Sequence, residues 1–355
     1  MTVNQWIPAA HAGDATGDNA RRLRDLFRDW GHTADIFALT IDAGLEDDIR
    51  PWSDPDANQG DVTILHFAVP SPMTAAFGRL PGLRVLCYHN VTPARFFAPF
   101  DAGLVGLATA GRRELRSLVG RVDLALAVSD YNRRELEAYG FERTGVLPLI
   151  LDTDRLRAAP PVPDLDALLS DGLANILFVG RIAPNKKIED HIRLLEHYKR
   201  YVDSFYRFIF VGRYDAVPAY YSAIRALIER FEILPDRVWF TGSVPEAELA
   251  AYYRHAHVYV SLSEHEGFCV PLVEAMAMDV PVLAYGAAAV PETLGGAGVT
   301  FAPKNLEYAA ELLADLVYDE PLRERIIGGQ RARLDAFQPD RIEAEIDAAL
   351  APVGV

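Results

Sequence analysis

Short apolar runs alternate with longer amphipathic segments along most of this sequence. In the first part of the chain, the apolar runs fall at residues 3–8, 34–39, 61–67, 83–88, 123–128 and 145–150. Between the first two runs, one face of a predicted helix collects Leu23, Leu26, Phe27 and Trp30. Either Asp18 or Asn19 can cap this helix. Strands separated by helices form βα units, so the pattern predicts a parallel sheet.

The same alternation returns after an interruption. The segment 152–172 opens with a stretch rich in proline and charge, which is typical of an interdomain linker. New apolar runs then fall at 174–180, 205–212, 237–242, 257–262, 280–285 and 298–302. A last helical pattern begins at Pro339. We therefore predict an N-terminal α/β domain over 1–151, a linker over 152–172, a C-terminal α/β domain over 173–335, and a C-terminal helix within 336–355 that packs back toward the first domain.

Composition narrows the class of protein. The chain has 355 residues, of which 50% are hydrophobic, and its formal net charge is -15. This length favours two domains, and the hydrophobic fraction argues against disorder. A negative field repels the nucleic-acid backbone, so we expect no nucleic-acid partner.

The cysteines and the apolar runs also bear on location. Cys87 and Cys269 fall in different predicted domains and offer neither a disulfide framework nor a zinc spacing. The first residues, MTVNQWIP, lack the pattern of a signal peptide, and no apolar run is long enough to span a bilayer. We expect a cytoplasmic protein. Peripheral contact with the inner face of the membrane through the basic amphipathic stretch 104–121 is an alternative, but a core helix with a solvated arginine face is favoured because the net charge opposes anionic lipid.

Two cations follow the first apolar run of the second domain. In FVGRIAPNKK, Arg181 comes directly after Gly180, and Lys186 lies five residues further on. An arginine fork and a lysine point charge at the carboxyl end of a strand suit a diphosphate. The alternative is an ordinary solvated basic turn.

Two glutamates flank a predicted helix start in SEHEGFCVPLVEA. Pro271 can begin the helix, and backbone N–H groups from Phe268 to Leu272 would then form an anion site at the positive end of the helix dipole. We expect Glu274 to be free to accept hydrogen bonds from ribose hydroxyls, and Glu266, which precedes the helix, to face the group beyond the phosphates. Together with the cations, this pattern is typical of a nucleotide-sugar site.

Three motifs carry a resemblance to a known family. GRIAPNKK, EGFCVPLVEAMAMDVPVLAY and VPETLGGAGVTF stand in the order and at the spacing of the retaining glycosyltransferases of family 4. The resemblance covers essentially the whole chain and is strongest in its second half. It implies the α/β GT-B fold, with two Rossmann-like domains whose parallel sheets face each other across a cleft. It also implies transfer of a hexose-type sugar from a UDP- or GDP-type donor without a metal or other cofactor.

The resemblance assigns roles in the second domain. It implies that Arg181 and Lys186 bind the donor diphosphate and stabilise the leaving group. Glu274 would hold the ribose, and Glu266 would contact the donor sugar near its reacting centre. The further donor contacts are Gly180, Gly267, Phe268, Cys269 and Val270. Many members have glycine where Cys269 stands, and we expect an ordinary backbone conformation at this cysteine.

The first domain offers weaker matches. The loop HAGDATGDNA lacks the GxGxxG spacing of a dinucleotide site but resembles the family's glycine loop, which makes Gly13 and Asp14 candidates for donor binding. A plain capping loop is the alternative. His89, just past an apolar run, matches a family histidine that binds sugar. The acceptor, a saccharide, a lipid-linked molecule or another small molecule, would lie mainly against this domain.

Other functions stay open. A glycoside hydrolase would use Glu266 and Glu274 as acid and base, but it would leave Arg181 and Lys186 without a task. A nucleotide-sugar epimerase shares the two-domain shape, and a non-catalytic subunit would bind the donor without turnover.

A metal site is not favoured in the second domain. Its candidate ligands are His255, His257, Glu264 and His265. The strand register sends neighbouring side chains to opposite faces, so these residues are not expected to meet.

Overall fold

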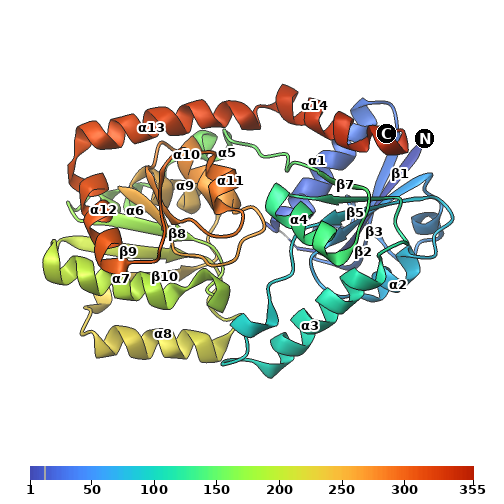
Figure 1. The fold of residues 1–355 in the computed structure, drawn as a ribbon. Coiled ribbons are helices and arrows are strands. Elements are labelled where there is room, and N and C mark those ends of the chain that lie inside the picture. Colours follow the sequence, from blue (N-terminus) through green and yellow to red (C-terminus); the bar gives the residue numbers. More distant parts are fainter. Residues whose placement is uncertain (12) are drawn as a thin grey trace. The chain divides into compact units, whose positions relative to one another are not determined.

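The computed structural model describes residues 1–11 and 13–355, which form two compact units. Unit 1 comprises Met1–Ala98, Ala102–Leu151 and Phe337–Val355, and unit 2 comprises Pro99–Asp101 and Asp152–Ala336. Each unit is built on one parallel sheet with helices on its faces (Figure 1). Among the described helices, none is both long and apolar enough to cross a bilayer.

Unit 1 contains a seven-stranded sheet in the order β3-β2-β1-β4-β5-β6-β7, and every paired neighbour is parallel. The strands are β1 (Thr2–Ala10), β2 (Thr33–Ile41), β3 (Arg50–Pro51), β4 (Val62–Phe67), β5 (Leu83–Tyr88), β6 (Leu124–Ala127) and β7 (Thr144–Val146). The sequence pattern missed only β3 among these strands, because two residues that include a proline carry no periodic signal. Proline is tolerated there because β3 is an edge strand.

The helices of unit 1 are α1 (Ala15–Asp29), α2 (Pro72–Phe77), α3 (Ala102–Ser117), α4 (Asp130–Tyr139) and α14 (Pro339–Leu350). The predicted cap of α1 was wrong. Asp14, rather than Asp18 or Asn19, is the N-cap, and its carboxylate accepts the Gly17 N–H. A weak helix former at Gly17 hid the first turn from the sequence pattern.

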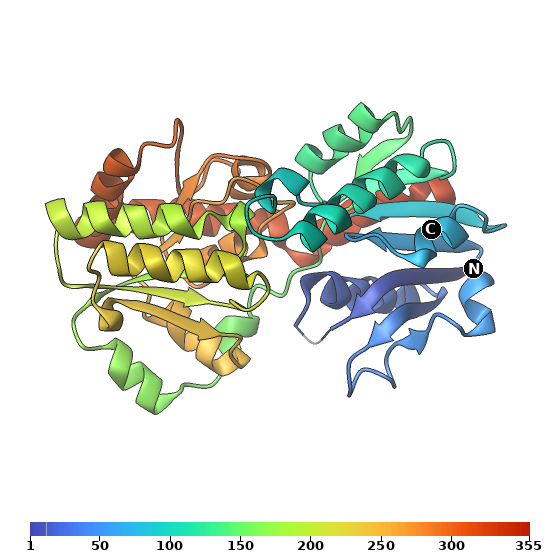
Figure 2. The same cartoon turned by 90° about the horizontal axis from the view of Figure 1, so that it is seen from below.

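Unit 2 contains a six-stranded parallel sheet in the order β10-β9-β8-β11-β12-β13. Its strands are β8 (Ala174–Val179), β9 (Tyr206–Val211), β10 (Val238–Gly242), β11 (Val258–Ser261), β12 (Val282–Tyr285) and β13 (Val299–Phe301). Its helices are α5 (Arg155–Ala158), α6 (Pro163–Leu169), α7 (Ile188–Tyr201), α8 (Pro218–Arg230), α9 (Glu246–Arg254), α10 (Val270–Ala277), α11 (Val290–Leu294), α12 (Leu306–Tyr318) and α13 (Glu320–Leu334). Helices α7 and α8 lie side by side (Figure 2).

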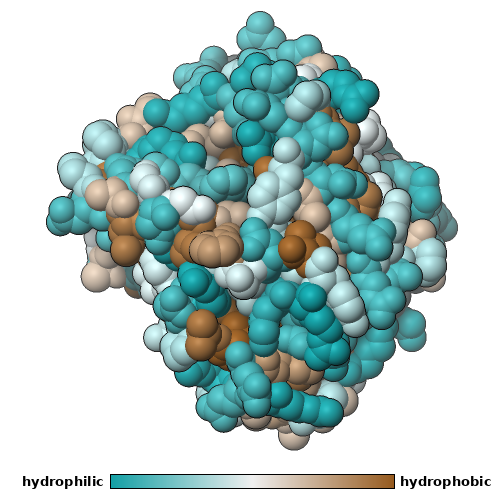
Figure 3. All heavy atoms as spheres, turned by 90° about the vertical axis from the view of Figure 1, so that its left-hand side faces the viewer, coloured by the Kyte–Doolittle hydropathy of each residue, from teal (hydrophilic) through white to brown (hydrophobic). Residues whose placement is uncertain are grey.

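The surface of unit 2 is mostly polar on the face that Figure 3 shows. The apolar areas visible there are small and are separated by hydrophilic side chains. Isolated exposed hydrophobic residues of this kind are normal on a protein surface and do not mark a docking site.

The predicted linker is part of the folded structure. Helices α5 and α6 lie within 152–172, and both bond to the rest of unit 2. Arg157 on α5 forms an ion pair with Asp279 at 2.9 Å, and Asp166 on α6 pairs with His255 at 2.9 Å. Proline at the start of a helix is favourable, and that is the role of Pro163. Proline content alone therefore did not predict the two helices of this segment.

Each sheet reverses its direction of growth at one point. In unit 1 this switch point lies between β1 and β4, and in unit 2 it lies between β8 and β11. Loops diverge at the carboxyl ends of such neighbouring strands, which leaves room for a ligand. The prediction of two Rossmann-like α/β units is confirmed. The cleft between facing sheets and the exact domain limits stay predictions.

Candidate functional site

The loop after β8 is held close to β9 by two glycines. Gly180 has a φ of +149° and donates its N–H to the Val211 carbonyl at 2.8 Å. A Cβ at Gly212, whose φ is +135°, would lie 2.3 Å from the Gly180 carbonyl oxygen. Only glycine allows so close an approach. This contact places Arg181 at the carboxyl edge of the sheet, beside the switch point.

Arg181 differs from most arginines of unit 2. Its side chain is exposed, and no described residue forms a hydrogen bond or ion pair with it. Arg155 and Arg207, by contrast, both form ion pairs with carboxylates. The Arg181 guanidinium therefore keeps its five donors for a ligand.

Lys186 and Glu266 form a partly buried ion pair. Lys186 Nζ lies 2.6 Å from each of the two Glu266 carboxylate oxygens. The side chains are only 18% and 8% exposed. The sequence predicted both residues for the site but not their pairing, since they lie on the loops of two different strands. Removing either partner would leave an uncompensated charge out of water.

Asn185 ties the same two loops together through the backbone. Its side-chain amide donates to the His265 carbonyl at 3.0 Å, and its own carbonyl accepts the Glu264 N–H at 2.9 Å. Asn185 stands inside the GRIAPNKK motif, but sequence reasoning missed it. A polar residue in a loop gives no signal of the backbone groups that it will bind.

Glu274 is not free, contrary to the expectation. Arg155 Nη2 lies 2.5 Å from one carboxylate oxygen, and the Tyr253 hydroxyl donates to the other at 3.0 Å. Burial raises the pKa of Glu274 from its ordinary value, while Arg155 opposes the shift. Sequence reasoning missed Arg155 because it lies in the segment assigned to the linker.

Cys269 has a left-handed backbone, with a φ of +76°, so the expected ordinary conformation was wrong. The residue lies directly before α10, and its carbonyl accepts the Leu272 N–H at 3.0 Å. This turn demands the conformation for which glycine is suited. Burial raises the pKa of the Cys269 thiol, so the sulfur is a poor nucleophile.

The other predicted residues of this segment lie at the start of α10. Gly267, Phe268 and Val270 are partly exposed, and the Phe268 carbonyl accepts the Thr293 hydroxyl at 2.5 Å. The first turn of α10 contains no acidic side chain. The positive end of its dipole is therefore not compensated within that turn, which favours a bound anion.

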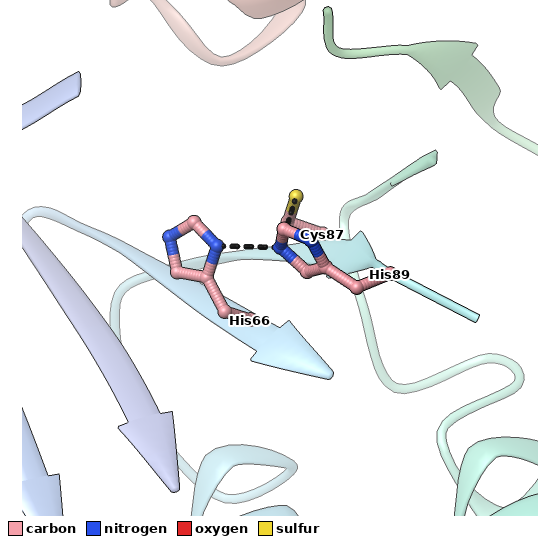
Figure 4. Close-up of side chains that lie close together, drawn as sticks. All are labelled: His66, Cys87 and His89. Carbon is pink, nitrogen blue, oxygen red and sulfur yellow. Dashed lines mark hydrogen bonds between the residues drawn. The ribbon is translucent and has the colours of Figure 1, made fainter. Parts of the chain in front are cut away.

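The predicted residues of unit 1 lie after β1 and β5. Gly13 has a φ of +73°, and the Asp14 carboxylate caps α1, as in the plain capping loop of the alternative. His89 lies beside His66, which sequence reasoning missed (Figure 4). The only sequence signal for His66 is that it stands one residue before the end of the neighbouring strand.

The hypotheses of a membrane-binding stretch and of a metal site both concern residues that form other contacts in the structure. In the stretch 104–121, Arg112 pairs with Glu135 at 2.6 Å, and Arg116 lies over the Tyr139 ring. Of the four suggested metal ligands, His255 contacts Asp166, His257 accepts the Asn175 N–H and Glu264 pairs with Lys304. The fourth, His265, offers its carbonyl to Asn185.

Comparison with known proteins finds a family match in the second half of the chain. Residues 167–333 match the family described as glycosyl transferases group 1. This matched segment is a little under half of the chain. The glycosyltransferase resemblance seen in the sequence is thereby confirmed.

Among curated relatives, the chain is similar to a GDP-mannose-dependent alpha-mannosyltransferase of Mycolicibacterium smegmatis. The two are 31% identical over 237 residues, which is 63% of this chain and 56% of that protein. It is also 28% identical over 226 residues to the O-antigen chain mannosyltransferase B of Escherichia coli, covering 60% of this chain and 56% of the relative. The chain thus matches a little over half the length of these relatives.

Solved structures share the fold over the whole chain. Anabaena HepE in complex with UDP and glucose matches with a TM-score of 0.77 and 17% identity, covering 99% of both chains. WaaG, a glycosyltransferase involved in lipopolysaccharide biosynthesis, matches with a TM-score of 0.73 and 15% identity, covering 99% of this chain and 100% of that one. These matches confirm the predicted GT-B fold class.

Proposed function

We propose that this protein transfers a hexose-type sugar from a nucleotide diphosphate sugar to an acceptor hydroxyl. One observation carries the proposal. Arg181, an exposed arginine without a partner among the described residues, lies at the switch-point edge of unit 2, on the same loop as Lys186 of the Lys186–Glu266 ion pair. An unpaired guanidinium there fits the two phosphates of such a donor.

The leaving diphosphate poses the main electrostatic task. In the proposed mechanism, Arg181 binds it through its planar fork, and Lys186 adds a second positive charge. The uncompensated N-terminus of α10 contributes further in the same sense. Lys186, which Glu266 holds, and the start of α10 are fixed in advance of the reaction, so they stabilise developing negative charge without reorganisation. The proposed site works without a divalent metal.

The ion pair of Glu266 supports transfer with retained configuration on one face of the sugar. A carboxylate that receives two short contacts from an ammonium group is a weak nucleophile, which argues against a covalent intermediate on Glu266. In the proposed step, the bond from the anomeric carbon to the phosphate oxygen breaks and the acceptor oxygen bonds on the same face. The acceptor proton passes to the departing phosphate. Glu266 positions the sugar.

GDP-mannose is the donor that we propose to test first. Three curated relatives carry names that specify this donor, whereas solved structures of similar fold hold UDP or UDP-glucose. The Glu274 carboxylate accepts from Arg155 and Tyr253 and still has lone pairs for a ribose hydroxyl. The backbone from Gly267 to Val270 would contact the phosphate and the sugar.

Unit 1 supplies the acceptor side in this proposal. Gly13, Asp14 and His89 would contact the sugar and the phosphates, and a saccharide or lipid-linked acceptor would bind nearby. We propose a cytoplasmic location. We propose that any contact of the stretch 104–121 with the membrane is weak, because two of its four arginines, Arg112 and Arg116, are already engaged with Glu135 and Tyr139.

The experiment is a nucleotide panel on the purified protein with EDTA present. GDP-mannose, UDP-glucose and ADP-glucose are compared by thermal shift and by release of the free diphosphate. We expect stabilisation by one nucleotide family and slow release of its diphosphate, with a retained anomer in any glycoside product. No shift with any nucleotide, or cleavage of a simple glycoside without nucleotide, would contradict the proposal.

A further inference from the structure

Three polar side chains form a hydrogen-bonded row near the switch point of unit 1. Gln5 lies on β1, His66 on the adjacent β4, and His89 just after β5. Gln5 Oε1 lies 2.8 Å from His66 Nε2, and His66 Nδ1 lies 2.8 Å from His89 Nε2. Figure 4 shows the two rings joined in this way, with the Cys87 sulfur beside them. Gln5 and His66 have no exposed surface.

The direction of the first bond is fixed by the backbone of α1. Gln5 Nε2 donates to the Ala20 carbonyl at 2.9 Å, and a carbonyl can only accept. The amide is therefore oriented with its oxygen toward His66. Because that oxygen also only accepts, His66 must carry a proton on Nε2.

The second bond then fixes the proton of His89. Burial lowers the pKa of His66 well below its ordinary value, so its ring is neutral near pH 7 and its Nδ1 is a lone-pair acceptor. His89 Nε2 must supply the proton between the two rings. Burial lowers the pKa of His89 to about 4, so this ring holds one proton as well, and its Nδ1 is left unprotonated.

We propose that Gln5 and His66 are positioning residues that fix His89 in the tautomer whose Nδ1 accepts a hydrogen bond from a sugar hydroxyl. His89 is partly exposed, and its Nδ1 has no partner in the described part of the chain. A histidine of the other tautomer would present an N–H there and would donate to the hydroxyl oxygen instead of accepting from the hydroxyl. Only the identity of the ligand rests on the proposed function, whereas the tautomer does not.

A metal site is the competing explanation of the same cluster. His66, Cys87 and His89 offer three ligand atoms within 4.8 Å of one another. However, the two ring nitrogens are 2.8 Å apart, which is a hydrogen-bond distance. Two nitrogen ligands of a tetrahedral zinc, each bonded at about 2.0 Å, would be roughly 3.3 Å apart. Burial also raises the pKa of the Cys87 thiol to about 12, which disfavours the thiolate that a metal requires.

Nitrogen-15 NMR of the histidine-labelled protein reads the tautomers directly. We expect His66 and His89 to carry their proton on Nε2. His191 is an internal reference for the opposite tautomer, because its Nδ1 faces the Lys187 carbonyl at 2.9 Å and its Nε2 accepts the Leu262 N–H at 3.2 Å. An Nδ1–H tautomer or a doubly protonated ring at His89 in the unmodified protein would overturn the proposal without any variant.

Gln5→Leu tests whether Gln5 sets the tautomers of His66 and His89. Loss of the acceptor should let His66 move its proton to Nδ1 and so force His89 into the Nδ1–H tautomer, while His191 stays unchanged. Gln59→Leu, at an exposed glutamine of unit 1, is the matched control and should alter neither ring. An unchanged His89 in folded Gln5→Leu would contradict the relay.

Adding Zn²⁺ or a nucleotide sugar to the labelled protein distinguishes this proposal from a metal site and from a histidine that binds no donor. One equivalent of Zn²⁺ that shifts both histidines, and fails to do so in Cys87→Ser, would replace the relay by a metal site. GDP-mannose or UDP-glucose should shift the resonance of an unprotonated His89 Nδ1 in the unmodified protein, whereas in Gln5→Leu any shift should be that of an Nδ1–H donor. If no donor shifts it but the tautomers are as expected, the relay stands and the proposed function fails.

Discussion

Arg181 and Lys186 leave the same loop but have different surroundings. Arg181 is exposed and has no partner among the described residues, whereas Lys186 is held by both oxygens of Glu266. An exposed unpaired arginine contributes little to stability, so its presence at the switch point is best explained by a ligand. The partly buried pair contributes to the structure as well as to the site.

A double-mutant cycle measures how strongly Lys186 and Glu266 depend on each other. Lys186→Met or Glu266→Gln alone should lower the free energy of unfolding by about 3 kcal/mol, since each leaves a polar or charged group without its partner. The double variant should lose clearly less than the sum of the two. Urea unfolding gives the three values. Additive losses would show that the pair is not coupled as its geometry indicates.

Cys269 offers a test of backbone strain. Cys269→Gly and Cys269→Ala both remove the buried thiol, but only glycine relieves the left-handed conformation. The glycine variant should therefore be the more stable of the two by roughly 1 kcal/mol. Elsewhere alanine is the more stabilising residue. Equal stability, or a more stable alanine variant, would contradict a strained turn at this position.

Individual residues were the least predictable level of the site. The sequence predicted that Arg181, Lys186, Glu266 and Glu274 belong to one site, because strand ends and motif spacing are local properties. It could not show that Glu274 bonds Arg155 or that His66 bonds His89, because these partners come from distant segments. Contacts of this kind depend on strand order, which the apolar pattern does not contain.

At the scale of elements, the sheets were the predictable part. Buried parallel strands are continuous apolar runs, so all but the two-residue β3 were expected within a few residues. Helices α5 and α6 were missed because their proline and charge are typical of linkers as well as of helix starts. What distinguishes the two is bonding to the rest of unit 2, which the sequence does not reveal.

The prediction at the scale of elements concerns the close packing of β9 against the loop after β8. Gly212→Ala should push the Gly180–Arg181 segment away, because the new Cβ would lie 2.3 Å from the Gly180 carbonyl oxygen. We expect a loss of about 1–3 kcal/mol of unfolding free energy, as for other overpacked sites, together with weaker nucleotide binding.

Gly329→Ala is the matched control. Gly329 lies inside α13, and a Cβ there meets nothing within 4 Å. Alanine should raise stability by roughly 0.5–1 kcal/mol and leave nucleotide binding unchanged. If Gly212→Ala behaved like Gly329→Ala, close packing of the two strands would not be what positions Arg181.

At the scale of the whole molecule, the two units repeat one principle. Each has a doubly wound parallel sheet, and the side chains of interest lie near its switch point. In unit 2 these are charged groups suited to phosphates, and in unit 1 they are neutral hydrogen-bonding groups suited to hydroxyls. The groups near the two switch points therefore suit different chemistry, phosphate in unit 2 and hydroxyl in unit 1.

The most direct test of the proposed diphosphate site compares two arginines of unit 2. Arg181 and Arg225 are both exposed and without a partner among the described residues, but Arg225 lies on α8, away from the strand ends of the sheet. Calorimetric titration with GDP and UDP in the presence of EDTA measures binding of the diphosphate to the unmodified protein, Arg181→Ala and Arg225→Ala. We predict that Arg181→Ala loses at least tenfold in affinity for the nucleotide that binds, since a hydrogen bond to a charged group contributes about 1.5–3 kcal/mol. Both variants should keep their unfolding free energy within about 0.5 kcal/mol, and Arg225→Ala should keep its affinity. Equal affinity in Arg181→Ala and the unmodified protein would contradict a diphosphate site at the β8 edge.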